Sequence, residues 1–298
     1  MKVAVIVLNY NGWQDTLECV ESLKNAQHPN LKSEIIIVDN NSSDGSQKRL
    51  SKIKYITLIE NTQNLGYSGG NNTGIKYALD KDFNFILLIN NDTYVDKNFF
   101  EHLYPALKIA EILSPKIYFA PGFEFHKSNY NKADLGKVVW YAGGKIDWQN
   151  ILGSHIGVDE VDNGQFSESK EIDFATGACM LVKREVFEKI GLLDEKYFLY
   201  LEDMDFCVRA KKAGFAISFF PKAVVWHKNA ASSGGSGSKM QDYYITRNRL
   251  LFAFKFAALK TKFAVLKQVT LQANDRIKRL ALADFLTYRF GKSHADIT

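Results

Sequence analysis

The sequence predicts an α/β protein in which a mainly parallel sheet is flanked by helices. Strand-like and helix-like patterns alternate over the first hundred residues, which is typical of βαβ units. Polar side chains follow one expected strand after another, as they do where a doubly wound sheet holds a ligand. The chain has 298 residues, of which 46% are hydrophobic and 24% charged, the composition of a soluble globular protein.

The first half of the chain gives the clearest pattern. Residues 3–8 form a continuous apolar, β-branched run, as expected of a strand buried on both faces. Leu17, Val20 and Leu23 then fall on one stripe of a helix. The alternation continues with expected strands at residues 34–38, 55–59 and 85–89 and expected helices at residues 71–79 and 99–110.

The second half is less regular. Residues 118–170 are rich in Gly, Asn and aromatic residues, and we expect loops and short strands that cover one end of the sheet. Regular patterns return with an expected strand region at residues 172–183, helices at 184–190 and 202–214, and short strands at 216–220 and 223–227. Residues 231–238 have the composition of a Gly/Ser linker, and the pattern beyond them is helical to about residue 290.

These patterns divide the chain into parts. We expect a first domain over residues 1–230, which divides into halves at about 1–115 and 116–230. Residues 231–238 would link it to a basic helical region at residues 239–298.

Several classes of protein are disfavoured. The 21 Phe and 14 Tyr residues supply ample surface to bury, so disorder is not the main state. Apolar runs are far shorter than the ~18 residues of a membrane span, and the first residues do not read as a secretory signal. Three widely spaced cysteines disfavour a disulfide scaffold or a zinc site, and we expect buried free thiols in the reducing cytoplasm.

Charge is concentrated at the C-terminal end. The chain has a net charge of +5, and residues 260–298 carry eight Lys and Arg against three Asp, which accounts for the whole excess. Leu250, Phe254 and Ala257 form an apolar stripe within the same helical region. A basic amphipathic helix can lie peripherally on an anionic membrane. The alternatives are that the stripe packs on the first domain or joins two subunits in a homodimer; nucleic acid is not an expected partner.

The ends of the first four expected strands carry the chemistry. The polar segments that follow them are residues 9–12, 39–46, 64–72 and 90–92. Because the carboxyl ends of parallel strands meet at one edge, these segments predict a shared ligand site. No GxGxxG or GxxxxGK[ST] follows the first strand, so a dinucleotide-binding or P-loop site is poorly supported. Asp39 suits hydrogen bonding to the imide N–H of uracil or thymine, or alternatively an Asx turn.

These segments carry a family resemblance. Residues 5–11, 38–46, 64–72 and 88–92 resemble the family 2 glycosyltransferases in that order. The resemblance continues through residues 177–182, 197–205 and 226–228, covers about residues 2–250, and is strongest to the rhamnosyltransferase-like branch. It implies a GT-A fold, a UDP- or dTDP-sugar donor, a divalent metal (Mg²⁺ or Mn²⁺) and inversion at the anomeric carbon. It also implies a glycan or lipid-linked glycan acceptor, as in polysaccharide or cell-envelope biosynthesis. Residues 1–230 would then be the catalytic domain, with a nucleotide-sugar half at about 1–115 and an acceptor half at about 116–230.

By position, the resemblance implies that Asp39 holds the donor base. It places six other residues in the donor site: Asn9, Tyr10, Asn64, Gly66, Asn71 and Asn91. Asn71 stands where many relatives have an Arg near the diphosphate, so a charged phosphate contact is missing at that position.

The metal motif departs from the family pattern. Residues 90–92 occupy the DXD position, but the first carboxylate is replaced by Asn90, and Asp92 is the only anionic member. Mg²⁺ commonly binds through one or two carboxylates plus substrate phosphates, so a single carboxylate is compatible with a metal. His227 matches a metal-ligating His of some relatives; alternatively it is a hydrogen-bonded histidine at a strand end.

An inverting transfer is a single displacement that needs a base for the acceptor hydroxyl and positive charge for the departing diphosphate. The resemblance implies that Asp203 is the base, with Glu202 as the second choice, while Asp205 supports the loop. Alternatively, these acidic residues only complement the dipole of the helix that they begin.

The acceptor side is less defined. Trp140 and Trp148 suit stacking on sugar rings, or alternatively a small satellite core. The resemblance places Gly177 and Ala178 near the acceptor and allows Arg247 to contact the diphosphate.

Two other functions stay open at this level. A sugar-nucleotidyltransferase would share the N-terminal design, although residues 9–12 lack the Gly-rich basic loop of such enzymes. The second is a sugar-binding relative that has lost catalytic activity. The loss of one DXD carboxylate favours this alternative, whereas the presence of Asp203, Asp92 and His227 argues against it.

Overall fold

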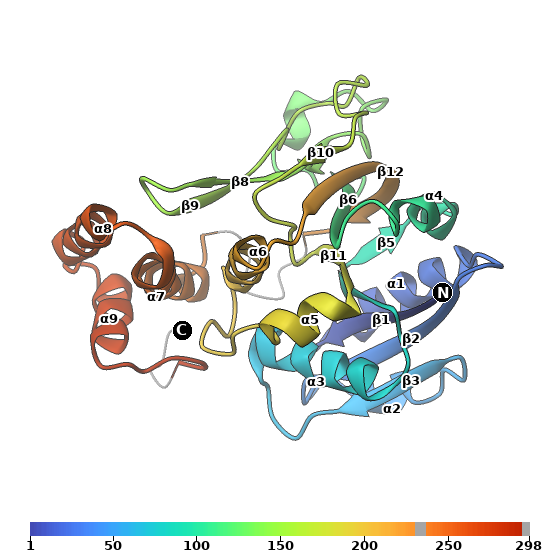
Figure 1. Cartoon of the computed structure of the whole chain (residues 1–298), viewed down its shortest axis with the longest axis horizontal. Coiled ribbons are helices and arrows are strands. Elements are labelled where there is room, and N and C mark those ends of the chain that lie inside the picture. Colours follow the sequence, from blue (N-terminus) through green and yellow to red (C-terminus); the bar gives the residue numbers. More distant parts are fainter. Residues whose placement is uncertain (230–236, 294–298) are drawn as a thin grey trace.

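The computed structural model describes residues 1–229 and 237–293. One twisted sheet runs through the molecule, with helices on both faces and a group of C-terminal helices at one end (Figure 1). The main strands, in order across the sheet, are β10 (Lys170–Glu171), β12 (Ile217–His227), β6 (Ile112–Phe119), β11 (Cys179–Lys183), β4 (Phe85–Asn90), β1 (Lys2–Asn9), β2 (Lys32–Asp39) and β3 (Ile56–Glu60).

Most of the sheet is parallel, as the sequence predicts. β1 pairs in parallel with β2 and β4, β2 with β3, and β12 with β6, whereas β11 runs antiparallel to β4 and β6. β5 (Thr93–Val95) pairs with β12, and β7 (Val139–Tyr141) pairs with β6. β8 (Gly144–Asp147) and β9 (Leu152–His155) form a separate hairpin. The sheet therefore takes strands from both expected halves of the catalytic domain.

The helices largely follow the sequence patterns. Those around the sheet are α1 (Trp13–Asn25), α2 (Ser46–Leu50), α3 (Gly66–Asp80), α4 (Phe99–Ala106), α5 (Arg184–Ile190) and α6 (Glu202–Lys212), with a short 3₁₀ turn at Lys127–Asn129. The C-terminal helices are α7 (Lys239–Phe256), α8 (Leu259–Leu271) and α9 (Arg276–Leu286). Of the expected Gly/Ser linker, residues 231–236 lie outside the described residues.

Five elements differ from the sequence-based expectation. α3 begins at Gly66 rather than near residue 71, because tertiary packing outweighs the low helix propensity of its glycines. α4 ends at Ala106, one residue beyond Pro105, rather than at 110. β6 was not expected, and only the end of residues 172–183 is a strand. The two short strands expected around Pro221 are one strand with a shifted register, because proline cannot donate to the ladder.

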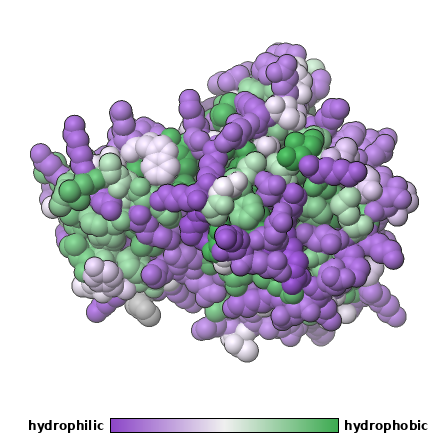
Figure 2. Space-filling model, in the orientation of Figure 1, coloured by the Kyte–Doolittle hydropathy of each residue, from purple (hydrophilic) through white to green (hydrophobic). Residues whose placement is uncertain are grey.

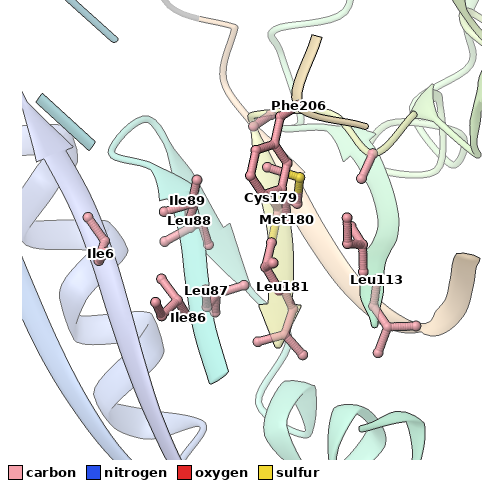
Figure 3. Packing of buried hydrophobic residues seen from close by; sticks show 14 of the residues in the cluster. Ile6, Ile86, Leu87, Leu88, Ile89, Leu113, Cys179, Met180, Leu181 and Phe206 are labelled. Carbon is pink, nitrogen blue, oxygen red and sulfur yellow. The ribbon is translucent and has the colours of Figure 1, made fainter. Parts of the chain in front are cut away.

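The core lies on both faces of the central strands. Residues 3–7 of β1 are fully buried, in agreement with the apolar run in the sequence. Leu88 and Ile89 of β4 lie beside Met180 and Cys179 of β11, with Phe206 of α6 packed over them (Figure 3). All three cysteines are buried free thiols, as expected. This packing fixes α6 against the sheet and so positions its first turn.

The C-terminal helices belong to the same packed structure. Leu250 of the expected apolar stripe is fully buried within the main core, so this part of the stripe packs on protein. α8 instead exposes apolar side chains, with Leu259, Phe263 and Leu271 at 68%, 60% and 70% exposure. Among the described residues, no helix is long and apolar enough to cross a membrane.

The start of α3 depends on glycine. Gly66 has a φ of +72°, and a Cβ there would overlap the Phe198 ring and carbonyl oxygen. Gly45 has a similar φ of +83° but open space around it. We predict that Gly45→Ala lowers the free energy of unfolding by roughly 1–2 kcal/mol, the cost of a left-handed conformation. Gly66→Ala should cost about 1–3 kcal/mol more, because the overlap adds overpacking.

Urea unfolding of the two variants measures this difference. Equal losses would show that the contact between Gly66 and Phe198 is loose enough to accept a methyl group.

Candidate active site

The parallel register brings the predicted polar segments to one edge of the sheet. Asn9 pairs directly with Asp39, and Leu8 pairs with Asn90, so β1, β2 and β4 end side by side. β3 ends at Glu60, opposite Asp39. The shared edge follows from strand pairing alone, because parallel strands in register finish at the same level.

Asp39 is a fully buried carboxylate that accepts three hydrogen bonds, which leaves one of its roughly four acceptor sites for a ligand. One oxygen accepts the Asn9 side-chain amide at 2.7 Å. The other accepts the Ser42 backbone N–H at 3.0 Å and the Gln47 side-chain amide at 2.8 Å. A buried carboxylate needs such partners to offset its lost hydration. Both sequence interpretations of Asp39 remain compatible with this arrangement, because the bond to Ser42 shapes the turn while the carboxylate stays fixed at the strand end.

Asn40 organises the neighbouring loop and was not among the expected site residues. Its amide donates to the Asn64 side chain at 3.0 Å and to the Gly66 carbonyl at 3.0 Å. Its oxygen accepts the Asn61 side-chain amide and the Leu65 backbone N–H. The sequence signal was its position directly after a buried strand, but the four partners are set only by the tertiary structure.

The other expected donor residues differ in their surroundings. Asn71 is buried and donates to the Tyr67 carbonyl, so its amide serves α3. Asn91 donates to the Gly12 carbonyl and the Thr16 hydroxyl, which ties the end of β4 to the start of α1. Tyr10 is exposed at the edge of the site.

Asp92 and His227 come together although 134 residues separate them in the chain. An Asp92 oxygen lies 3.0 Å from His227 Nε2, and both residues are nearly buried. The pairing of β5 with β12 sets this contact, since Thr93 lies opposite His227. The Trp140 ring packs edge-on against the His227 ring at 4.5 Å. The second imidazole nitrogen, Nδ1, has no hydrogen-bond partner within the described part of the chain.

This pair has the chemistry of a partial metal site. Carboxylate oxygen and imidazole nitrogen are common ligands of divalent ions. Two neighbouring ligands of an octahedral ion at 2.0–2.1 Å lie about 3 Å apart, which matches the Asp92–His227 distance. No third His, Cys, Asp or Glu completes a cluster within residues 1–229 and 237–293. The two side chains therefore fit a metal whose remaining ligands come from elsewhere.

A carboxylate pair begins α6. Asp203 accepts the Gly177 N–H at 2.9 Å and the Met204 N–H at 2.8 Å. Burial raises the pKa of the Asp203 carboxyl, and these two N–H donors oppose the increase. Glu202 is more deeply buried, and burial together with the Asp203 charge raises its pKa well above the usual range. One Glu202 oxygen has no partner among the described residues. Asp203 is therefore the better placed of the two to carry negative charge.

Gly177 connects this pair to the donor side of the site. Its N–H binds Asp203, while its carbonyl accepts the Tyr67 hydroxyl at 2.5 Å. Burial raises the pKa of Tyr67 well above its ordinary value, so the hydroxyl stays protonated and donates. Asp205 points elsewhere and binds Tyr197, Arg209 and Lys255, which agrees with its expected role in supporting the loop.

The segment before the pair has an unusual backbone. Phe198, Tyr200 and Leu201 have φ values of 58°, 70° and 69°. Each left-handed conformation of an L-residue costs roughly 1–2 kcal/mol. Such strain persists only where surrounding contacts impose it, and it is common beside functional groups.

The two tryptophans expected at the acceptor site lie in different surroundings. Trp140 packs against His227 and His155, beside the proposed metal pair. Trp148 is 42% exposed and packs on Phe252 of α7. Trp140 is partly buried against the main core and Trp148 is the more exposed of the two, and stacking on sugar rings stays a prediction for both. Ala178 lies buried beside Gly177, at the start of β11.

Arg247 does not face the strand ends. It is fully buried, and its guanidinium donates to the carbonyls of Lys196, Tyr197 and Gly291. This arrangement gives no support to the expected diphosphate contact, because the donors already serve the backbone.

The mainly parallel sheet with its flanking helices is the GT-A fold. Solved structures with the same fold include GalNAc-T7 with UDP, GalNAc and Mn²⁺, with a TM-score of 0.61 and 17% identity. That match covers 84% of this chain and about half (51%) of the other. Another is the 1–349 fragment of *S. aureus* TarS with UDP-GlcNAc, with a TM-score of 0.56, 17% identity, and coverage of 96% and 72%.

The sequence comparisons identify the family. The model of glycosyl transferase family 2 matches residues 4–191, and the chain belongs to that family. It is similar to the low-salt glycan biosynthesis hexosyltransferase Agl10 of *Haloferax volcanii*, with 28% identity over 84% of this chain and 74% of that protein. It is also similar to the dTDP-rhamnosyl transferase RfbF of *Shigella flexneri*, with 26% identity over 74% and 71%.

The protein is accordingly an inverting glycosyltransferase with a nucleotide-sugar donor. The sugar-nucleotidyltransferase and the degenerate binding protein considered from the sequence are set aside.

Proposed function

We propose that this enzyme transfers a sugar from a dTDP- or UDP-sugar to a lipid-linked glycan, and that the sugar is rhamnose. The Asp203 carboxylate, fixed by two N–H donors beside the strand-end site, is the observation on which the catalytic assignment rests. The sugar and the acceptor class are supported by the relatives. RfbF is named a dTDP-rhamnosyl transferase, and a *Mycobacterium tuberculosis* relative, 40% identical over 65 residues, is named an N-acetylglucosaminyl-diphospho-decaprenol L-rhamnosyltransferase.

In this proposal the donor lies along the strand ends. Asp39 receives the base, because its carboxylate is fixed at the end of β2, and Asn9 orients it. The loop built around Asn40, with Asn64 and Gly66, forms the wall between the base and α3. Asn71, Asn91 and Tyr10 keep their proposed place in the donor site. Asn71 and Asn91 act there by shaping backbone, since their amides bind neighbouring protein groups.

The acceptor hydroxyl is deprotonated by Asp203 as it attacks the anomeric carbon. A positioned carboxylate accepts the proton as the new bond forms. The raised pKa of Asp203 makes it a stronger base than an ordinary aspartate, while its two N–H partners oppose the increase and favour the ionised form. Activity is lost as the pH falls through this raised pKa, because the protonated acid no longer accepts a proton. Gly177, Ala178 and Trp140 line the proposed acceptor side next to the base.

Asp92 and His227 would hold a divalent ion, Mg²⁺ or Mn²⁺, together with the donor phosphates. Such an ion supplies positive charge to the departing diphosphate. Asp92 contributes the carboxylate and His227 the imidazole, and Trp140 fixes the ring orientation of His227.

We expect Asp203→Asn to reduce turnover of dTDP-rhamnose, followed as release of dTDP, by 10²–10⁴-fold, the usual range for loss of a general base. The amide keeps the shape of the side chain but cannot take up the proton. The affinity for dTDP, measured by calorimetry, should stay unchanged. If the variant keeps activity within a few-fold of the wild type, the base is Glu202.

Asp92→Ala should weaken metal-dependent donor binding, because it removes the carboxylate of the pair. Calorimetric titration of dTDP with and without Mn²⁺ measures the effect. Asp82→Ala is the matched control, since Asp82 is a highly exposed aspartate whose ion pair with Lys2 lies at the opposite end of β1. An unchanged difference between the two titrations in Asp92→Ala would refute the metal assignment.

The exposed face of α8 supports a peripheral membrane position. Leu259, Phe263 and Leu271 are exposed, while Val265 and Val269 on the other face are buried. Lys260, Lys262 and Lys267 lie on the same helix. Figure 2 shows apolar residues gathered over the C-terminal helices, with hydrophilic side chains projecting around them. An apolar face bordered by lysines is complementary to an anionic bilayer, each Lys contributing about 1 kcal/mol near the surface.

We expect the full chain to float with anionic liposomes at low salt and to detach at high salt. A triple variant, Leu259→Ser with Phe263→Ser and Leu271→Ser, should lose flotation, whereas Leu152→Ser on β9 should keep it. Point variants are preferable to truncation, because residues after α9 contact the loop before α6. No flotation of the full chain at low salt would contradict the proposal. A dimer that the triple variant disrupts, without flotation, would assign α8 to subunit contact.

A further inference from the structure

The loop before the catalytic pair presents a row of backbone carbonyls to α7. The side-chain amide of Asn248 donates to the carbonyls of Tyr197, Leu199 and Tyr200 at 2.8, 2.8 and 2.9 Å. Two N–H groups thus serve three carbonyl acceptors within a stretch of four consecutive residues. A single asparagine therefore holds most of the loop in which the left-handed residues lie.

Arg247 completes this arrangement. Its guanidinium donates to the Lys196 carbonyl at 3.1 Å and the Tyr197 carbonyl at 3.2 Å, and its Nε donates to the Asn248 oxygen at 3.0 Å. The last contact orients the Asn248 amide, so that its nitrogen and not its oxygen faces the loop. Both side chains are fully buried.

The Phe198 carbonyl accepts no hydrogen bond from Asn248 or Arg247, and its partner lies on α3. The Phe198 oxygen accepts the Tyr67 N–H at 2.6 Å, at the start of α3. The Phe198 ring stacks on Tyr244 of α7 at 5.3 Å. The loop is therefore held between α7 and the donor-side helix α3, and Tyr67 also binds Gly177, the partner of Asp203.

We propose that Asn248 and Arg247 are positioning residues of the transfer reaction, which hold the loop at residues 196–201 so that Asp203 meets Gly177. This inference rests on the proposed role of Asp203 as the base. Leu201 has a left-handed backbone and directly precedes α6, so any relaxation of the loop changes the direction in which α6 begins. In this proposal the C-terminal helices do more than pack on the core, because α7 imposes the left-handed backbone of the loop that precedes Asp203.

The pH dependence offers a readout that a purely structural role would not change. Titratable groups facing the Asp203 carboxyl are Glu202 and Cys207 on α6, Tyr67 on α3 and Tyr141 on β7. Burial raises the pKa values of the tyrosines and the thiol, so these three stay protonated at acid and neutral pH. A looser loop would change both the burial of Asp203 and its contact with the Gly177 N–H, which together set its raised pKa. The acid limb of kcat/KM should then shift.

The experiment compares Asn248→Asp with Arg249→Gln. The first change keeps the side-chain shape and removes both N–H donors. The second removes a neighbouring guanidinium on α7 whose donors go to Asn150 and Gln268, away from the loop. Arg247→Lys is a second variant, in case Asn248→Asp does not fold. It keeps the positive charge but loses the planar guanidinium that donates to several carbonyls at once. Turnover of dTDP-rhamnose, dTDP affinity and amide hydrogen exchange of residues 194–205 are measured for each.

We expect Asn248→Asp to lower kcat by ~10²-fold, the usual cost of a misplaced catalytic group. The affinity for dTDP should persist, exchange in the loop should become faster, and the acid limb should shift from its wild-type position. Arg247→Lys should show a smaller change in the same direction, and Arg249→Gln none. Unchanged loop exchange, or wild-type kcat and acid limb in folded Asn248→Asp, would overturn the proposal.

The two proposals fail in different ways. Full activity in Asp203→Asn, or no turnover by the wild type, refutes the proposed catalytic role. In either case, hydrogen exchange of the loop in Asn248→Asp still tests whether Asn248 holds residues 196–201, because that measurement does not depend on turnover.

Discussion

Parallel pairing of β1 with β2 and β4 is the constraint on which the rest of the site depends. It aligns Asn9 with Asp39 and Leu8 with Asn90, so three loops begin at one level. The buried Asp39 carboxylate then requires donors, and the loops supply them from Asn9, Ser42 and Gln47. The same polar groups that offset the cost of burial thereby fix the shape of the strand-end site.

The antiparallel strand β11 connects the two parts of the candidate site. It lies between β4, which ends just before Asp92, and β6, which pairs with the strand of His227. Gly177 comes just before β11 and has its N–H on Asp203 and its carbonyl on Tyr67. One short backbone segment therefore links α3 with Asp203, which explains why small residues are found there.

The C-terminal helices connect to this centre through backbone carbonyls and ion pairs. Lys255 of α7 binds both Asp194 and Asp205, on either side of the strained loop. The Gly291 N–H donates to the Lys196 carbonyl, so the chain after α9 also returns to the loop. These contacts place the helical region within the catalytic unit, while the exposed face of α8 points away from it.

The sequence by itself determined the alternation of strands and helices, the buried β1, the shared strand edge and the family, because periodicity and local motifs are properties of neighbouring residues. It also pointed to Asp203, Asp92 and His227 as candidates. Only the tertiary structure decided the partners of Asn40, the burial of Arg247, the separate surroundings of Trp140 and Trp148, and the single strand β12. These features depend on contacts between residues far apart in the chain, whose pairing no local pattern encodes.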